Sequence, residues 1–158
     1  MTIRVGFGYD IHQFSEDREL HIGGVQLDHE KGLLGHSDAD ILLHAIMDAM
    51  LGAANMRDIG YHFPDTSEEF KGADSKKLAR EVSRLIGTKG YLLINVDATV
   101  CLERPKLKPH IEEMQKVIAG LLSVEEDAIS IKATTSEKMG FVGKELGAKA
   151  YAVVLIQK

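Results

Sequence analysis

The chain has 158 residues, 44% of them hydrophobic and 27% charged, and this length predicts one domain over residues 1–158. Its net charge of −5 argues against nucleic acid as a partner, because binding to a duplex needs a basic face. No apolar run approaches the roughly 20 residues that span a bilayer, and the N-terminal residues do not resemble a signal peptide, so no membrane partner is expected. A single cysteine, Cys101, excludes an intrachain disulfide and favours a cytoplasmic location.

The N-terminal segment shows strand and hairpin signals. Apolar and polar residues alternate over 3–10, which predicts a strand. If this strand continues, its period of two places Asp10 and His12 on the same side. Farther along, Gly23-Gly24 separates two short apolar runs, which predicts a β-hairpin.

Residues 37–54 are apolar almost all round and predict a buried helix with Ser37 as its N-cap. Asp40, His44 and Asp48 form the one polar stripe on it, at a spacing of four residues. Buried carboxylates and imidazoles are costly unless they are paired or bound to metal. One interpretation is that Asp40 caps the helix, His44 is a hydrogen-bonded core histidine and Asp48 is an exposed acid. The other is that the stripe completes a metal site with Asp10 and His12. Two histidines, a carboxylate and an open position suit catalytic zinc, and the same ligand set also suits non-haem iron.

The second half of the chain predicts further alternation of helices and strands. Its expected elements are a loop over 58–74, a helix capped by Asp74 or Ser75, a strand over 91–102, a helix opened by Pro109, and strands over 128–135 and 148–156. This order implies an α/β or α+β sandwich with helices on one face of the sheet.

Three polar segments are candidates for phosphate binding. His36-Ser37 would lie at the start of the predicted helix, where it either caps the helix or contacts phosphate. The tract 132–138 combines hydroxyls, lysines and Glu137, so it is either a solvated strand end or a phosphate-binding turn whose carboxylate holds a hard cation. The basic turn 104–108 is either a surface turn or a nucleotide-binding loop.

Several motifs occur in a characteristic order along the whole chain. They are Gly-Tyr-Asp10-Ile-His12, Gly-Leu-Leu-Gly-His36-Ser37-Asp38-Ala-Asp40, His44, Asp58-Ile-Gly60, Phe63-Pro-Asp65-Thr66, Pro105-Lys106 and Lys132-Ala-Thr-Thr-Ser-Glu137-Lys-Met-Gly-Phe141. On these motifs the chain resembles the 2-C-methyl-D-erythritol 2,4-cyclodiphosphate synthase family of the non-mevalonate isoprenoid route.

The resemblance implies a ferredoxin-like α/β sandwich with a mixed sheet, assembled as a homotrimer with active sites between neighbouring subunits. It also implies the reaction, a phosphorus–oxygen lyase step on the nucleotide-diphosphate substrate 4-diphosphocytidyl-2-C-methyl-D-erythritol 2-phosphate. The 2-phosphate attacks the β-phosphorus, CMP leaves, and the cyclic diphosphate closes.

The resemblance further implies the site residues. One zinc per subunit is held at Asp10, His12 and His44, and a magnesium or manganese ion is held at Glu137. His36 and Thr135 match positions that steady the transition state, and Asp40 becomes a capping or orienting residue. The substrate-binding positions are Asp10, His12, His36, Ser37, Asp58, Ile59, Gly60, Phe63, Pro64, Asp65, Thr66, Ser67, Leu102, Pro105, Lys106, Leu107, Lys108, Thr134, Thr135, Ser136, Glu137, Phe141 and Lys144.

One position departs from the family pattern. Lys144 stands where many relatives carry an arginine at the mouth of a central trimer cavity that holds isoprenoid diphosphates. Lysine keeps the charge but loses the forked geometry of arginine. The alternatives to a cyclising enzyme are a metal phosphohydrolase that uses a zinc-bound hydroxide, and a trimeric isoprenoid-diphosphate binding protein that would not need Asp10, His12 and His44.

Overall fold

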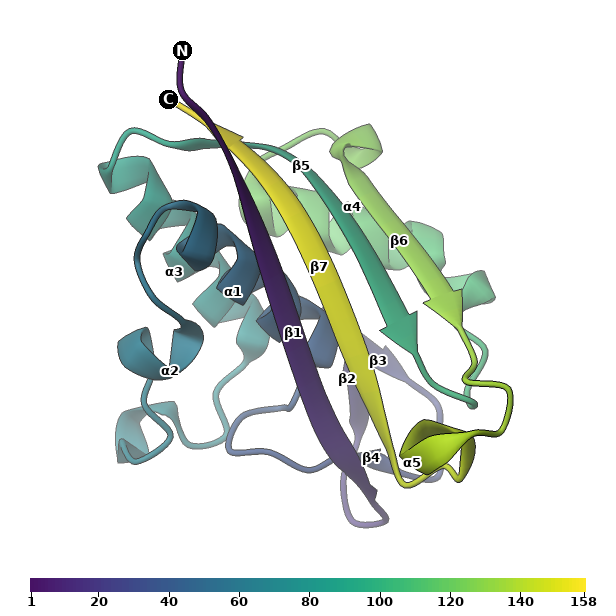
Figure 1. The fold of residues 1–158 in the computed structure, drawn as a ribbon. Coiled ribbons are helices and arrows are strands. Elements are labelled where there is room, and N and C mark those ends of the chain that lie inside the picture. The colour runs from purple at the N-terminus through teal and green to yellow at the C-terminus, as the bar shows by residue number, and fades with distance from the viewer.

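The computed structural model of the chain describes all 158 residues apart from the side chain of Glu69. Four strands come first and three helices follow them, and from β5 onward strands and helices alternate (Figure 1). The strands are β1 (Ile3–Ser15), β2 (Leu20–Ile22), β3 (Val25–Leu27), β4 (Gly32–Leu33), β5 (Leu92–Cys101), β6 (Ile129–Thr134) and β7 (Gly147–Gln157). The helices are α1 (Ile41–Ala53), α2 (Ile59–His62), α3 (Ser75–Thr88), α4 (Ile111–Leu122) and α5 (Gly140–Gly143), with 3-10 turns at Glu68–Phe70, Lys108–His110 and Glu126–Ala128.

The main sheet has five strands in the order β4-β1-β7-β5-β6, and β2 and β3 form a separate hairpin. β7 is antiparallel to both β1 and β5, whereas β5 and β6 are parallel. The long helices α1, α3 and α4 lie on one face of this sheet (Figure 1). The predicted mixed sheet with helices on one face is therefore confirmed.

The ferredoxin-like connection order is wrong for this chain. A ferredoxin-like fold runs β-α-β-β-α-β, so its second and third main strands follow one another directly. Here α4 lies between β5 and β6, and this helical crossover is what makes them parallel neighbours. The final strand, β7, then inserts between β1 and β5. The main elements consequently run β-α-β-α-β-β.

Helix α1 packs unusually close to strand β1. A Cβ built on Gly8 would lie 1.8 Å from the carbonyl oxygen of Ala45, and one built on Gly6 would lie 1.9 Å from that of Ala49. Glycine is required at both positions because the helix backbone fills the space of a side chain. Since side chains alternate along a strand, the next residues on this helix-facing side are Asp10 and His12.

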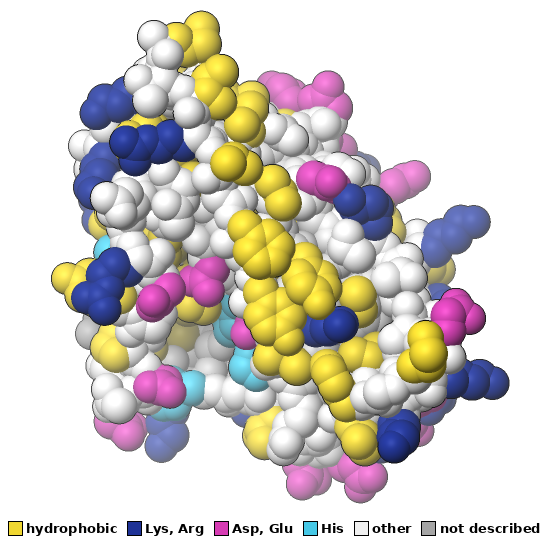
Figure 2. Space-filling view, in the orientation of Figure 1, with side chains coloured by type: hydrophobic (Ala, Val, Ile, Leu, Met, Phe, Trp, Pro, Cys, Tyr) yellow, Lys and Arg dark blue, Asp and Glu magenta, His cyan; other side chains and the backbone are white. Residues whose placement is uncertain are grey.

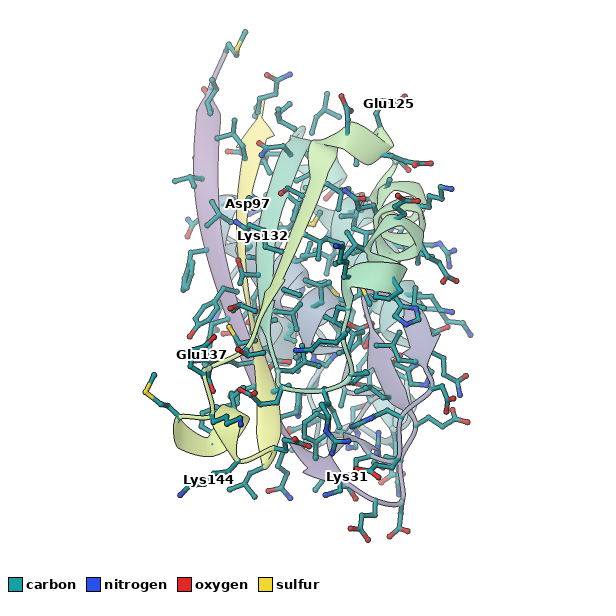
Figure 3. The ribbon with its side chains drawn as sticks, turned by 90° about the vertical axis from the view of Figure 1, so that its right-hand side faces the viewer. Lys31, Asp97, Glu125, Lys132, Glu137 and Lys144 are labelled. Atoms are coloured by element: carbon teal, nitrogen blue, oxygen red, sulfur yellow. The ribbon has the colours of Figure 1, made fainter. Side chains whose placement is uncertain are left out.

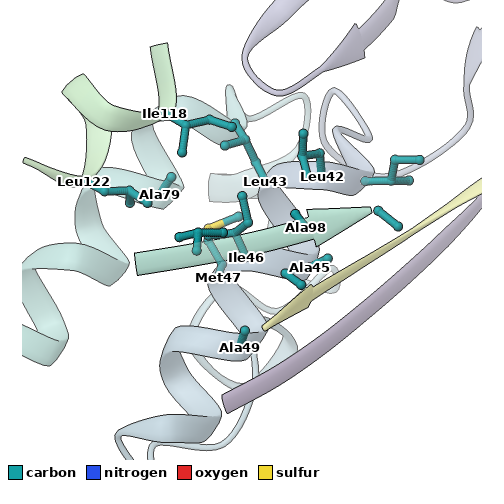
Figure 4. Close-up of a cluster of buried hydrophobic side chains, with 14 of the residues drawn as sticks. Leu42, Leu43, Ala45, Ile46, Met47, Ala49, Ala79, Ala98, Ile118 and Leu122 are labelled. Atoms are coloured by element: carbon teal, nitrogen blue, oxygen red, sulfur yellow. The ribbon is translucent and has the colours of Figure 1, made fainter. Parts of the chain in front are cut away.

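The core is centred on α1, whose apolar residues are buried on nearly every side. Leu42, Leu43, Ile46 and Met47 point toward side chains from α3, α4 and β5 (Figure 4). Burying side chains of this size contributes roughly 1.5–3 kcal/mol each. This packing holds α1 rigidly behind the sheet, and so fixes the polar residues that the helix carries.

Most predicted boundaries agree with the structure to within one or two residues, but β1 continues to Ser15, well beyond the alternation over 3–10, and two helices begin later than expected. The helix expected over 37–54 begins at Ile41, because Asp40 and not Ser37 has the N-cap conformation and accepts from the Leu43 amide. Pro109 lies in a 3-10 turn, and α4 begins at Ile111. The hairpin is confirmed, and both Gly23 and Gly24 adopt positive φ. Among the described residues, no helix is long and apolar enough to cross a membrane.

The other face of the sheet carries exposed apolar side chains. They form a continuous stripe over β1 and β7 (Figure 2). Its members include Ile3, Val5, Phe7, Tyr9, Ile11 and Val153. A stripe of this length is typical of an interaction surface.

Candidate metal centre and neighbouring pockets

Asp10, His12 and His44 come together where β1 passes the start of α1. Each offers one ligand atom, and these atoms all lie within 4.8 Å of one another. The Oδ2 atom of Asp10 lies 3.1 Å from Nε2 of His12 and 3.0 Å from Nδ1 of His44. The grouping expected from the sequence is therefore present.

Hydrogen bonds orient both imidazole rings. The Nδ1–H of His12 donates to the carbonyl oxygen of Leu34 at 2.7 Å, which leaves Nε2 directed at Asp10. The opposite nitrogen of His44, Nε2, lies 2.9 Å from the hydroxyl of Ser75, so Nδ1 is the atom that faces Asp10. Partners of this kind are typical of histidines that bind metal.

The electrostatics of the three residues favour a cation. Burial opposes ionisation of Asp10, but the adjacent rings of His12 and His44 outweigh it and lower the pKa of Asp10 to about 2. Burial likewise opposes the charged form of His12, yet the Asp10 carboxylate raises its pKa above the usual value. Two ring nitrogens and one carboxylate thus converge on a small region, and this donor set fits a divalent ion with an open position for substrate.

The three residues open into a cavity of about 310 Å³. Histidine and acidic side chains are visible in a hollow beside the apolar stripe (Figure 2). The cavity is lined by Asp10, His12, His36, Ser37, His44, Ile59, Gly60, Phe63, Asp65, Phe70 and Leu78. Of the predicted substrate positions in the first half of the chain, Asp58, Pro64, Thr66 and Ser67 fall outside this described lining.

Asp48 and Asp58 hold the short helix α2 against the cavity. The side chain of Asp58 caps α2 by accepting from the Tyr61 amide at 2.9 Å. Asp48, on α1, accepts from the Ile59 amide at 2.8 Å. The stripe residue Asp48 is half-buried and not an exposed acid, and it ties the cavity segment to the core helix.

A second pocket of about 120 Å³ lies at the ends of β5 and β6. It is lined by Leu102, Pro105, Lys106, Leu107, Lys108, Ala133, Thr134 and Thr135. The strand order places β7 and β5 between β1 and β6. At the usual spacing of neighbouring strands, β1 and β6 are on the order of 14 Å apart. Within one chain, the predicted site residues therefore form two separate groups.

The turn after β6 presents Glu137 in a constrained backbone. Glu137 and Lys138 have φ values of 54° and 62°, in the left-handed region that ordinary residues rarely adopt. The Glu103 carboxylate accepts from the amides of Ser136 and Lys138 and so supports the turn. The hydroxyl of Thr135 donates to Glu137 at 3.2 Å. Figure 3 shows Glu137 at this end of the sheet, and Lys144 farther along near α5.

The structure corrects the expectation for the residues before α1. His36 and Ser37 precede the helix by several residues, and Asp40 already occupies its N-terminus. The buried Asp40 carboxylate accepts from the amides of Leu43, Gly23 and Gly24, which joins α1 to the β2–β3 hairpin. Asp40 is thus a cap, as expected, while His36 and Ser37 line the cavity without lying at the helix end.

Sequence reasoning missed three residues around the site. Ser75, the first residue of α3, contacts His44, and Asp38 accepts from the hydroxyl of Ser75. Glu103 supports the Glu137 turn. The motif around His36 contains Asp38, but nothing in its spacing links it to Ser75, which lies 37 residues farther along the chain.

Comparison with known proteins identifies the family. The YgbB family model matches residues 3–157. Curated relatives from Bacteroides fragilis and Phocaeicola vulgatus are each 63% identical over 158 residues, covering 100% of this chain and 99% of the relative. A relative from Cytophaga hutchinsonii is 57% identical over the same length. All are named 2-C-methyl-D-erythritol 2,4-cyclodiphosphate synthase.

Solved structures agree with this assignment. The bifunctional IspDF from Campylobacter jejuni matches with a TM-score of 0.94 and 42% identity, over 98% of this chain and 42% of that longer protein. The IspF CDP complex from Plasmodium falciparum matches with a TM-score of 0.85 and 36% identity, over 98% of this chain and 95% of its own. The chain therefore belongs to the YgbB family, the family of 2-C-methyl-D-erythritol 2,4-cyclodiphosphate synthases.

Proposed function

We propose that the chain, acting as a single domain over residues 1–158, converts 4-diphosphocytidyl-2-C-methyl-D-erythritol 2-phosphate to 2-C-methyl-D-erythritol 2,4-cyclodiphosphate and CMP. The observation that carries this proposal is the convergence of Asp10, His12 and His44 on one cavity, in a chain similar over its whole length to synthases of that name. Relatives solved as CDP complexes support a cytidine nucleotide as the leaving portion of the substrate.

The reaction needs no external nucleophile. An oxygen of the 2-phosphate attacks the β-phosphorus, the bond from that phosphorus to the oxygen bridging the α-phosphate breaks, and this oxygen leaves with CMP. The nucleophile is already anionic, so the main tasks are to bring two mutually repelling phosphates together and to offset their charge. This chemistry therefore needs groups that position both ends of one substrate and cations that offset the phosphate charge.

Two cation sites follow from the available carboxylates and imidazoles. Asp10, His12 and His44 would hold one zinc ion per subunit, in the three-ligand pattern of catalytic zinc. Glu137 is an exposed single carboxylate, which suits a magnesium or manganese ion that takes most of its other ligands from phosphates and water. When bound, such ions supply Lewis-acid stabilisation of the transferring phosphoryl group.

The two pockets divide the substrate between them. His36 and Ser37 would contact phosphate beside the metal ligands, and the segment with Ile59, Gly60, Phe63 and Asp65 would contact the erythritol and ribose. Asp58, Pro64, Thr66 and Ser67 would support that segment from outside the lining. The second pocket would hold cytidine and diphosphate through Leu102, Pro105, Lys106, Leu107, Lys108, Thr134, Thr135, Ser136 and Glu137, with Thr135 steadying the transition state.

A homotrimer reconciles these pockets with one substrate. In a single chain, Asp10, His12 and His44 form one group, here called the metal group, beside β1. Glu137 lies in the turn that follows β6. β1 and β6 are not neighbours in the sheet. If the exposed apolar faces of three copies pack together, one copy's metal group can face another copy's turn. Phe141 and Lys144 would then border a central cavity suited to an isoprenoid diphosphate. We place this assembly in the cytoplasm, in keeping with its single free cysteine.

Release of CMP by metal-replete protein tests the proposed reaction. We expect wild-type protein and the control variant His110→Ala to release CMP with formation of the cyclic diphosphate, and His44→Ala to lose this activity. No CMP release by folded, metal-replete wild type would refute the proposal. Metal analysis of the same samples should find zinc, and iron at that site would correct the metal but not the reaction.

A further inference from the structure

His44 makes a polar contact through each of its ring nitrogens. Nδ1 lies 3.0 Å from Asp10 Oδ2, on the side of the cavity. Nε2 lies 2.9 Å from Ser75 Oγ and 3.2 Å from Ser37 Oγ, on the opposite side. The residue His44 is 7% exposed and Ser75 is fully buried, so bulk water does not compete for these contacts.

The hydroxyl hydrogen of Ser75 is committed to Asp38. Ser75 Oγ donates to Asp38 Oδ1, and the Ser75 amide donates to Asp38 Oδ2 at 3.0 Å. A serine hydroxyl has one hydrogen and two lone pairs. Because Asp38 takes the hydrogen, Ser75 can offer only a lone pair to His44. The hydrogen between the two residues must therefore belong to Nε2 of His44.

Placing the hydrogen on Nε2 determines what His44 offers to the cavity. A neutral imidazole that carries its hydrogen on Nε2 has a free lone pair on Nδ1. That lone pair faces the region where Asp10 and His12 converge. His12 is arranged in the opposite sense, with Nδ1 bound to Leu34 and Nε2 facing Asp10.

We infer that Ser75 and Asp38 are positioning residues that hold His44 in the Nε2–H tautomer, with Nδ1 presented as a metal ligand. The inference rests on the metal role proposed for His44, but not on the identity of the reaction. It gives the start of α3 a function, because Ser75 is the first residue of that helix and joins it to the metal group. Residues that orient a liganding histidine in this way typically change metal affinity tenfold to hundredfold when they are replaced.

Zinc affinity, measured by competition with a chelator, tests the inference. We expect Ser75→Ala to bind zinc roughly tenfold to hundredfold more weakly than wild type. Ser75→Thr retains the hydroxyl and should bind more tightly than Ser75→Ala. Ser83→Ala removes another part-buried serine of α3, one that contacts the carbonyl of Leu122 at 3.5 Å, and should match wild type. Asp38→Asn keeps the size of the side chain but has one acceptor oxygen where two are used, so it should also weaken binding. It provides a second test if Ser75→Ala does not fold.

A spectroscopic measurement separates positioning from a general loss of stability. In zinc-loaded protein with isotope-labelled histidine, NMR should show Nδ1 of His44 bound to metal and a slowly exchanging hydrogen on Nε2. Ser75→Ala should make that hydrogen exchange faster while the circular dichroism of the fold is unchanged. Equal zinc affinity and equal exchange in wild type and folded Ser75→Ala would overturn the inference and leave the proposed reaction intact. Failure of the wild type to bind zinc would overturn the inference together with the proposed zinc site, and CMP release would then test the reaction separately.

Discussion

Gly8 and Ala45 are in backbone contact, since a Cβ on Gly8 would lie 1.8 Å from the Ala45 carbonyl oxygen. This contact sets the distance between β1 and α1. Two residues farther along β1 lies Asp10, and one residue before Ala45 lies His44. The metal group therefore depends on a close approach that glycine alone permits.

Adding one methyl group at this contact should separate the strand from the helix. We expect Gly8→Ala to lower the free energy of unfolding by about 1–3 kcal/mol, as overpacking typically does, and to weaken zinc binding. Gly52→Ala is the matched control, because Gly52 lies on α1 with nothing within 4 Å of its added Cβ. That control should be neutral, or stabilising by up to about 1 kcal/mol. Equal effects of the two substitutions in urea unfolding and zinc titration would contradict this account.

The half-buried Asp48 should make stability depend on pH. Burial raises its pKa, with further contributions from Asp58 and Asp10, so the folded state holds the Asp48 proton to higher pH than the unfolded state does. Ionisation therefore costs stability as pH rises from the ordinary value of 3.8 through the raised value. Asp48→Asn keeps an acceptor for the Ile59 amide and removes this cost. Its stability relative to wild type should increase over that pH range, and a difference that is constant or falls with pH would be inconsistent with this prediction.

Glu103 should affect substrate binding through the turn that carries Glu137. Glu103→Ala removes the acceptor for the Ser136 and Lys138 amides. We expect kcat/KM to fall roughly tenfold to hundredfold, because a displaced positioning group has effects of that size. Glu103→Gln keeps one acceptor oxygen and should retain most activity. Glu125, at the opposite end of β6 (Figure 3), provides an exposed control. If Glu103→Ala behaved like Glu125→Ala, the turn would not need Glu103.

Mixing two inactive variants tests whether the active site is shared between copies. His44→Ala damages the metal group, and Glu137→Ala damages the turn, which lie in separate parts of one chain. If one copy's metal group works with another copy's turn, random mixed trimers should regain about one quarter of the sites. Unfolding and refolding the two variants together provides this mixture, and CMP release measures the recovery. Continued inactivity of properly refolded mixtures would place both groups in the same copy.

Periodicity predicted much of the fold because local patterns determine it directly. Alternation along β1 correctly placed Asp10 and His12 on one side, and Gly23-Gly24 correctly predicted the hairpin. The predicted start of α1 was wrong because both Ser37 and Asp40 are residue types that favour the N-cap position. The choice between them depends on Gly23 and Gly24, whose amides also bind Asp40.

The remaining features depend on contacts between distant parts of the chain. The position of β7 between β1 and β5 is decided by tertiary packing, so the family resemblance suggested the wrong connection order. Ser75 was seen as a helix cap, and its contact with His44 follows only from the packing of α3 against α1. Local sequence patterns therefore found the three candidate metal ligands but not the residues that contact them from α3 and the segment before α1.

The most direct test of the proposed function is to run the reaction in water enriched in the heavy oxygen isotope and to measure the masses of both products. Cyclisation forms the new phosphorus–oxygen bond within the substrate, so we predict that neither CMP nor the diphosphate product gains a heavy oxygen. The diphosphate product should also be lighter by one water than the open-chain hydrolysis product. A product that carries one heavy oxygen would show attack by water, and would make the protein a phosphohydrolase rather than a cyclodiphosphate synthase.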